Sequence, residues 1–521
     1  MAFLKKLWKN LLGSGRHSRS KRRDPNFPIE IYYRPFDEKA LSIVPSPPLQ
    51  TESLESKHQE LDAQASLAPQ PLVLQLPDDL LGSIFEYYIE DSTHNPRDGT
   101  FSWTDVASSL KATRASKTSP ITLGHVCSHW RKLTFSIPNL WSSITIFKPT
   151  MSKIPAIEFW LERASDCPLS IALFSNETSE HVATKQVLSL LLTRAHLWKH
   201  LELQIHAAGV PHTELLSFGE GVTTRLESVN LQLIESTWEH AFVDQIWRNT
   251  HSLPTLRRVF WDSQYVADSI PTHAPWAQLT HISINNKWSK WHLKPSSFLK
   301  LIQKCQDLIS LDFNIDEYWD VPFNIAPFTL PNLRDLRIQA LGFVDASALL
   351  SRLILPSLTS LELSYSPMFL PSGAHLVNWI KDLLARSSCQ LQRLSLWYWA
   401  MSEDEFLDLF SSAEMQQLAH FDIKFGSMPE WIVKRLMHIA DDPRRTLPDL
   451  ATLALPPIET SDVARAVDMI KSRVLLSSTE GRSTRCDLCE SKLALKKLVF
   501  HCPSDFSLSV YPSFQGLSHE L

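Results

Sequence analysis

One pattern of residues occurs twice in close succession, as LPNLRDLRI at residues 330–338 and as LPSLTSLEL at residues 355–363. In each copy an apolar residue is followed by two other residues, a second apolar residue, one other residue and a third apolar residue. The last two apolar side chains point to the same side of an extended chain, because side chains alternate along a strand. The pattern therefore predicts a short strand with one buried side, entered by a turn at the first apolar residue.

The same triplet recurs along most of the chain after residue 140. It starts at Trp141, Trp198, Leu226, Leu256, Leu279, Leu308, Leu333, Leu358, Leu391, Leu418 and Leu450. From Trp198 onward the starts lie 23 to 33 residues apart, by subtraction of these numbers. A unit of this length cannot bury its apolar side alone, but stacked neighbours bury it together. We therefore predict an α/β fold in which an irregular leucine-rich-repeat solenoid carries a parallel sheet on its inner face.

The segments between the triplets contain helix-like stretches, expected at Ser297–Cys305, Ala374–Arg386 and Glu403–Phe410. Two aromatic clusters, Trp288–Trp291 and Trp397-Tyr398-Trp399, either line the inner face, where they would suit a protein partner, or belong to the core. Both interpretations stay open. Asp316 and Glu317 show no paired geometry, so we predict no acid–base site there.

The composition excludes several classes of function. A chain of 521 residues is too long for one ordinary core and predicts two folded parts, or a repeat array with a smaller module. Its net charge of −5 argues against nucleic-acid binding. With only 13 glycines, it lacks the glycine-rich phosphate loops, and the hydrolase and zincin motifs are also absent. We therefore expect no enzymatic activity, no cofactor and no metal.

The seven cysteines are odd in number and mostly widely spaced, which fits reduced thiols better than a disulfide framework. No apolar run approaches the roughly 18 residues of a membrane-spanning helix. We expect a cytoplasmic or nuclear protein.

The N-terminal residues have a separate character. Residues 1–12 place their large apolar side chains on one helical face and their lysines elsewhere, and basic residues continue to Arg23. Such a tail could contact a membrane surface or carry a nuclear import signal at Lys21–Arg23, but we expect a basic tail without either role. Residues 24–70 are rich in Pro, Ser, Gln and Glu and predict a disordered linker.

Residues 74–90 predict the first helix of a helical pair. Pro77 suits a helix start, where its missing N–H costs nothing, and Asp78 and Asp79 fall in the first turn, where the helix dipole favours negative charge. The apolar stripe of this helix consists of Leu76, Leu80, Ile84 and Phe85.

A polar stretch at 91–119 leads to a second apolar helix at about 121–135, with a stripe of Val126, Trp130 and Leu133. A helical pair this short cannot bury both apolar stripes by itself. Part of its apolar surface must therefore contact the solenoid or a partner protein. Each large side chain that becomes buried contributes roughly 1.5–3 kcal/mol, and Trp130 is the expected anchor.

These segments resemble the F-box, in the version common in mushroom-forming fungi. The resemblance rests on LPDDLLGSIFEYY at 76–88, VCSHWRKL at 126–133 and PNLWSSI at 138–144. It continues into FWLERA at 159–164 and CPLS at 167–170. The long insertion between Tyr88 and Ile121 departs from the compact pattern of the family.

The resemblance implies that the helical pair docks on a Skp-type adaptor and through it on a cullin, while the repeats bind an unknown protein substrate. The chain would then be the substrate-recognition subunit of an SCF-type cullin–RING E3 ubiquitin ligase. The implied adaptor-binding residues are Leu76, Pro77, Leu80, Ile84, Phe85, Val126, Cys127 and Trp130. For Trp141 and Ile144 a role in the core is the expected one. The alternative is a leucine-rich-repeat interaction scaffold that takes no part in ubiquitination.

The predicted organisation has five parts. They are a basic amphipathic tail at 1–23, a disordered linker at 24–70, an F-box at 71–145, the irregular solenoid at 146–475 and a C-terminal tail at 476–521. We expect no metal site at His125 and His129, although their spacing suits one helical face. We also expect none at Cys486, Cys489, His501 and Cys502, which more simply form a tail with free thiols.

Overall fold

The computed structural model divides into two compact units, Met1–Gln75 and Leu76–Leu521. It describes residues 76–93, 119–175, 180–206, 225–234, 240–262, 275–285, 295–316, 326–341, 347–365, 373–397, 402–424, 430–436, 447, 450–455, 468–469 and 497–500. All of these belong to the second unit. The expected basic tail, the linker, the Trp288–Trp291 cluster and the cysteines near residue 490 lie outside the described residues.

Short helices open the second unit. They are α3 (Asp78–Thr93), α5 (Pro120–Gly124), α6 (Ser128–Ser136) and the 3₁₀ helix η4 (Pro138–Trp141). The second helix expected at 121–135 is therefore wrong as one continuous element. It breaks at residues 125–127, because His125 ends α5 and Cys127 caps the start of α6.

A parallel sheet of thirteen strands follows the helical cluster. Its strands lie side by side in chain order, and β8 and β10 make a separate pair. The strands are β1 (Ser143–Phe147), β2 (Leu169–Ser175), β3 (Trp198–His206), β4 (Ser228–Ile234), β5 (Arg258–Asp262), β6 (His281–Asn285), β7 (Ser310–Asp316), β9 (Asp335–Leu341), β11 (Ser360–Tyr365), β12 (Arg393–Trp397), β13 (His420–Lys424), β14 (Thr452–Leu455) and β15 (Lys497–Phe500). The small pair joins β8 (Phe328–Thr329) to β10 (Leu353–Ile354).

Each predicted triplet falls on one of these strands. In β11, Leu361 and Leu363 are buried while Ser360 and Glu362 are half-buried, which is the alternation that the pattern predicts. In-register pairing places Leu336 of β9 beside Leu361, so the apolar sides of successive strands form continuous buried rows. The coarse prediction of an α/β fold with a parallel sheet is confirmed.

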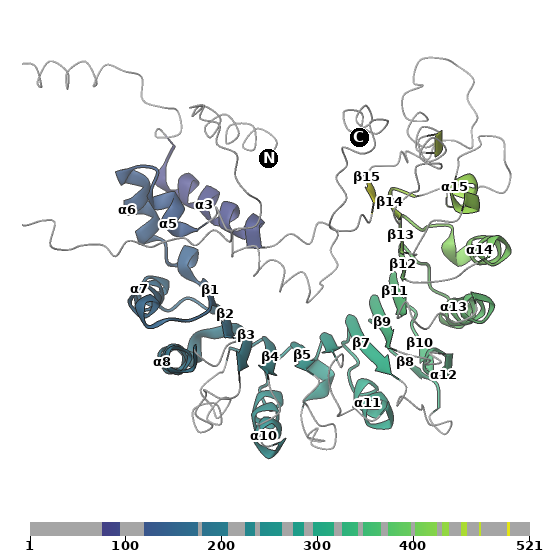
Figure 1. The fold of residues 1–521 in the computed structure, drawn as a ribbon, viewed down its shortest axis with the longest axis horizontal. Coiled ribbons are helices and arrows are strands. Elements are labelled where there is room, and N and C mark those ends of the chain that lie inside the picture. Colours follow the sequence, from purple (N-terminus) through teal and green to yellow (C-terminus); the bar gives the residue numbers. More distant parts are fainter. Residues whose placement is uncertain are drawn as a thin grey trace, which may run out of the picture. The chain divides into compact units, whose positions relative to one another are not determined.

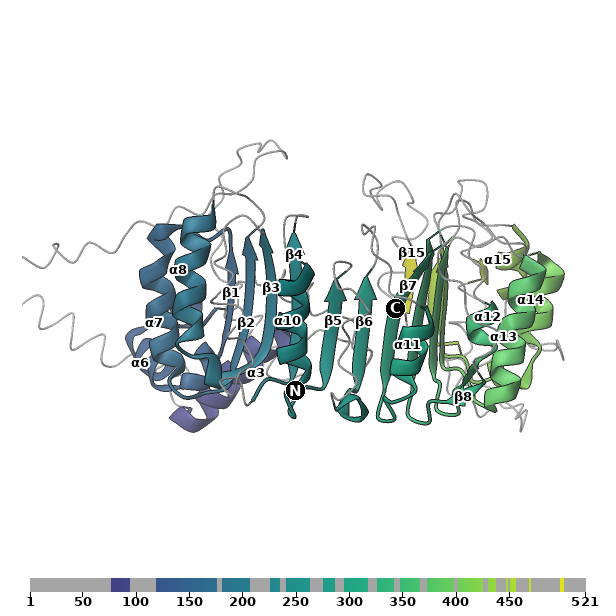
Figure 2. The same cartoon turned by 90° about the horizontal axis from the view of Figure 1, so that it is seen from below.

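Helices connect the strands and cover one face of the sheet. The α-helices are α7 (Ile154–Ala164), α8 (His181–Leu192), α10 (His240–His251), α11 (Pro295–Ile302), α12 (Ser347–Leu350), α13 (Gly373–Ser387), α14 (Glu403–Phe410) and α15 (Glu430–Leu436). The further 3₁₀ helices are η5 (Met151–Lys153), η7 (Ala195–Leu197), η10 (Trp276–Gln278) and η11 (Ala413–Met415). Figures 1 and 2 show α11, α13 and α14 on the same side of the sheet as α7 and α8, and none of the described helices covers the opposite face of β7–β13.

The apolar faces of these helices form the other half of the core. Phe298 of α11 meets Phe313 of β7 with ring centroids 5.2 Å apart, and Phe410 of α14 meets Phe421 of β13 at 5.0 Å. The helix at Glu403–Phe410, which the sequence predicts correctly, begins with a capping box. In this box Ser402 and Glu405 each accept the other's backbone N–H.

Two predicted boundaries need correction. Strand β1 spans the boundary predicted between residues 145 and 146, and the helices before it belong to the same compact unit as the sheet. Strand β15 lies within the predicted tail 476–521 and pairs with β14, so the sheet extends beyond residue 475. Leu495, Leu498 and Phe500 repeat the triplet spacing there and are the sequence signal for this strand.

Candidate functional site

The interior of the helical cluster is built from α3 and α6. Leu81 and Phe85 of α3 are fully buried, and Trp130 of α6 is 3% exposed. The rings of Phe85 and Trp130 pack at a centroid distance of 4.7 Å and an angle of 60°. Burial also raises the pKa of the Tyr88 phenol on the same helix. Phe85 and Trp130, both predicted as partner contacts, therefore hold the two helices together instead.

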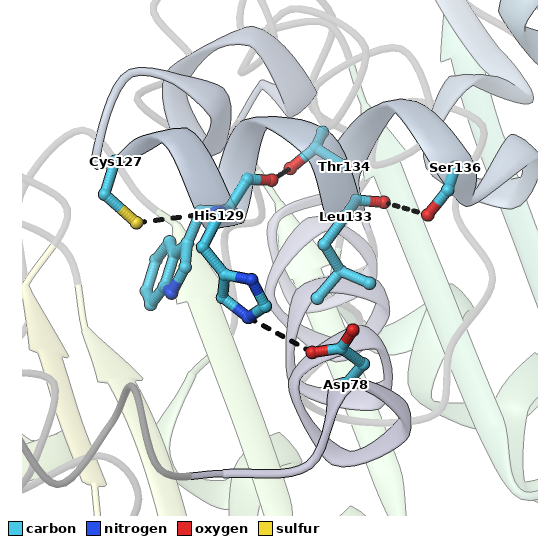
Figure 3. A network of polar contacts seen from close by, with 7 residues as sticks. Asp78, Cys127, His129, Leu133, Thr134 and Ser136 are labelled. Carbon is cyan, nitrogen blue, oxygen red and sulfur yellow. Dashed lines mark hydrogen bonds and ion pairs between the residues drawn. The ribbon is translucent and has the colours of Figure 1, made fainter.

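Side-chain and backbone hydrogen bonds fix the start and course of α6 (Figure 3). The Trp130 backbone N–H donates to the Cys127 Sγ at 3.4 Å, so this thiol serves as the N-cap of the helix. The Thr134 hydroxyl donates to the Trp130 carbonyl at 2.7 Å. His129 Nε2 lies 3.1 Å from Asp78 Oδ1 and joins α6 to the first turn of α3.

Trp141 joins the helical cluster to the first strands. It is fully buried and makes ring contacts with Phe135, Phe159 and Trp160 at centroid distances of 5.8, 5.7 and 4.9 Å. Its indole N–H donates to the Thr134 carbonyl at 3.0 Å, and its own carbonyl accepts from the Trp160 indole at 2.7 Å. The expected core role of Trp141 is confirmed, as is that of Ile144, which is 6% exposed.

Apolar side chains also remain on the outside of this cluster. Six large apolar residues are exposed among those that the structure describes, and four of them belong to α3, α5 and the turn after α5: Leu80 (51%), Tyr87 (44%), Ile121 (36%) and Val126 (58%). Leu80 and Tyr87 lie seven residues apart, two turns along one face of α3. Tyr87 and Ile121 were not among the predicted contact residues, although the seven-residue spacing from Leu80 could have identified Tyr87.

A shallow open depression of about 310 Å³ lies between α3 and the end of α6. Its lining consists of Asp78, Asp79, Gly82, Ser83, Glu86, Leu133 and Ile137. Gly82 permits the close approach, because a Cβ there would lie 3.0 Å from the Ile137 Cδ1. The Glu86 carboxylate accepts a hydrogen bond from the Asn139 amide at 3.2 Å. The lining of the depression therefore combines apolar and acidic side chains.

The structure thus separates the eight predicted contact residues into three groups. Pro77, Leu80 and Val126 are exposed, Leu76, Ile84 and Cys127 are half-buried, and Phe85 and Trp130 are buried. The exposed and half-buried members leave apolar surface accessible to solvent. The two buried aromatic rings do not.

The remaining candidates for chemistry carry no site in the described part of the chain. His125 ends α5 while His129 lies on α6 and faces Asp78, so the two do not share one helical face. No cluster of three metal-binding side chains occurs among the described residues. Burial raises the pKa of Cys305 to about 12 and that of Cys389 to about 11, so both remain protonated thiols. Within the same residues, no helix has the length and apolar character to cross a membrane.

Comparisons with known proteins give no assignment: no model of a known protein family matches the chain, and no curated protein matches it either.

Proposed function

We propose that this chain is an F-box protein, the substrate-recognition subunit of an SCF-type cullin–RING E3 ubiquitin ligase. Helices α3, α5 and α6 form the F-box, and the strand–helix units form an irregular leucine-rich-repeat solenoid. The F-box binds a Skp-type adaptor, the solenoid binds a target protein, and other subunits transfer ubiquitin. The chain itself carries out no catalysis.

The observation that carries the proposal is where the exposed apolar residues lie. Monomeric proteins leave single apolar side chains exposed, but a concentration of them in one small module marks a surface that a partner covers. Leu80, Tyr87, Ile121 and Val126 supply such a concentration in α3, α5 and the adjoining turn. The sequence resemblance to the F-box covers three of these residues, Leu80, Tyr87 and Val126.

The contact set follows from the exposure of each side chain. Leu76, Pro77, Leu80, Ile84 and Val126 remain as adaptor contacts, and Tyr87 and Ile121 join them. Phe85 and Trp130 support this surface from within, because their rings fix the spacing of α3 and α6. Cys127 acts through its cap on α6.

Affinity purification of the full chain followed by mass spectrometry tests the proposal. The test variant is Leu80→Ser/Val126→Ser. The matched control is Met151→Ser/Val182→Ser, whose side chains are equally exposed at 50% and 53% but lie on η5 and α8. A Skp-type adaptor and a cullin should co-purify with the wild type and the control and be lost with the test variant. Their absence from the wild type would instead favour a repeat scaffold outside ubiquitination.

A further inference from the structure

The face of the sheet opposite the helices carries an ordered set of polar side chains. Because Phe313 of β7 and Phe421 of β13 point to the helices, their neighbours Asp312 and Asp422 point to the opposite face. We call this the helix-free face and define it by β3–β7, β9 and β11–β13. Parallel pairing in register arranges its side chains in rows that cross the strands.

The central row is the charged one. From β7 to β13 it runs through Asp312, Arg337, Glu362, Ser395 and Asp422. The guanidinium of Arg337 lies between two carboxylates, with its Nε 2.8 Å from the Glu362 Oε2 and its Nη1 3.8 Å from the Asp312 Oδ2. This stretch of the row therefore holds three carboxylates and one cation.

The rows on either side balance this charge only in part. In the next row toward the strand N-termini, Asp335 pairs with Arg393 at 3.6 Å, so the two charges cancel. In the next row toward the strand C-termini, Asn314, Gln339 and Ser364 are uncharged, and Lys424 of β13 carries one positive charge. From β7 to β13 the three rows therefore hold four carboxylates and three cations, which leaves a negative excess on the helix-free face.

The other carboxylates of the central row disfavour the ionisation of Glu362. Burial raises the pKa of Glu362, Arg337 opposes that effect, and the charges of Asp312 and Asp422 raise the pKa further. A cation supplied by a partner would relieve this repulsion, because an opposite charge nearby favours the ionised carboxylate.

The same row contains an unsatisfied acceptor at its other end. It continues through Ser283 and Phe260 to Asn230 of β4 and Glu202 of β3. Asn230 is 3% exposed, and its amide nitrogen donates to the Glu202 Oε1 at 3.0 Å. Its Oδ1 receives no hydrogen bond from any described residue.

We propose that the helix-free face binds an extended, Lys- or Arg-bearing segment of the target protein, with its basic side chains along the row from Asp312 to Asp422. This inference rests on the proposed function for the fate of the target, since it names the class of segment that the solenoid recognises. A nucleic acid would be repelled by the same row.

The spacing of the carboxylates specifies the segment further. Neighbouring strands lie roughly 4.8 Å apart, so Asp312, Glu362 and Asp422, each two strands from the next, are spaced by roughly 10 Å. A polyproline II chain rises about 3.1 Å per residue with three residues per turn, so its residues i and i+3 share one side at about 9 Å. Basic residues at every third position of such a segment match the row.

Two peptides of identical composition test this with the full chain. The probe is a fluorescein-labelled peptide of four Lys-Pro-Ser repeats, and the comparison peptide carries its four lysines in one block followed by four Pro-Ser pairs. Fluorescence anisotropy at low salt should show tighter binding of the repeat peptide. The affinity should fall as salt is raised, because the contacts are electrostatic.

The variant Asp312→Asn/Glu362→Gln/Asp422→Asn removes the three carboxylates of the row. It also removes the two carboxylates that pair with Arg337, those of Asp312 and Glu362. The control Glu158→Gln/Glu162→Gln/Asp382→Asn changes the net charge equally at exposed positions of α7 and α13. We expect the first variant to bind the repeat peptide at least tenfold more weakly and the control to bind it within twofold of the wild type. Thermal unfolding of both variants shows that each is folded.

Equal weakening by the two variants, or equal affinity for the two peptides, would overturn the inference. Adaptor capture by the same proteins distinguishes this failure from failure of the proposed function. The central-row variant should retain the adaptor because its changes lie outside α3, α5 and α6. If the wild type captures the adaptor but binds both peptides equally, the basic-segment inference alone is refuted. If it prefers the repeat peptide but captures no adaptor, the ligase assignment alone is refuted.

Discussion

Replacement of Trp141 by alanine tests whether the helical cluster and the sheet are one cooperative structure. A buried tryptophan replaced by alanine costs about 3–5 kcal/mol. A loss of at least 4 kcal/mol is expected here, because Trp141 is fully buried among three aromatic rings and its indole donates to the Thr134 carbonyl. A loss of about 4 kcal/mol increases the population of the locally opened state roughly a thousandfold.

Hydrogen exchange followed by mass spectrometry measures this opening segment by segment. We expect amides of α6 and of β1–β2 to exchange up to a thousandfold faster in Trp141→Ala, because the helical cluster and the first strands both lose their contacts with the Trp141 ring. The matched control is Trp276→Ala, a tryptophan 3% exposed between β5 and β6, which should accelerate exchange in those strands and spare α6. Faster exchange in α6 with β1 and β2 unchanged would refute the reasoning, since the helices and the sheet would then open independently.

Substitutions at two further positions have expected outcomes that follow from single side chains. Burial lowers the pKa of His251 from 6.5 to about 3, so between these values the unfolded chain binds a proton that the folded chain does not. The stability that the neutral ring contributes is present above pH 6.5 and is lost as the pH falls, by at most about 1.4 kcal/mol per pH unit. His251→Phe should therefore flatten the fall of the urea midpoint between about pH 6.5 and pH 4, and an unchanged slope would assign that fall to other groups. Ser402→Ala removes the cap of α14 and should lower the free energy of unfolding in urea by about 1 kcal/mol. Ser402→Gly should lower it by only a few tenths of a kcal/mol. Equal effects of the two substitutions would contradict a capping role.

The strand positions could be predicted because each strand buries one side in the same way. The triplet records that burial directly, and the structure places β3, β4 and β5 where it occurs. Strand β2 lacks the full triplet for a local reason. It pairs in register with β1, so Pro168 stands where Trp141 stands, and a proline in the first position hides the pattern.

The break between α5 and α6 could not be read from periodicity, because apolar residues continue across it. Local signals were present: Gly124 lies at the end of α5, and its carbonyl accepts from the Arg131 Nε at 3.0 Å. Cys127 and Ser128 then stand at the start of α6. A capping analysis would have separated the two helices where the spacing of apolar residues could not.

The surface residues of the helical cluster were predictable only in part. An apolar stripe shows which side chains share a helical face, but not whether that face meets another part of the chain or a partner. Phe85 and Leu80 belong to one predicted stripe, yet Phe85 is fully buried against Trp130 and Leu80 is 51% exposed. The difference depends on where α6 packs, which is a tertiary property. The charged central row likewise depends on the register of strands far apart in the sequence.

The central claim is that Leu80 and Val126 are covered by a Skp-type adaptor, and calorimetric titration of the purified chain with that adaptor tests it most directly. Full burial of such a side chain contributes roughly 1.5–3 kcal/mol. With exposures of 51% and 58%, complete covering of both would contribute about 1.6–3.3 kcal/mol, or roughly a 15- to 200-fold change in Kd. We predict a weakening within that range for Leu80→Ser/Val126→Ser and less than threefold for Met151→Ser/Val182→Ser. Equal affinities for the two double variants, or no binding by the wild type, would contradict the claim.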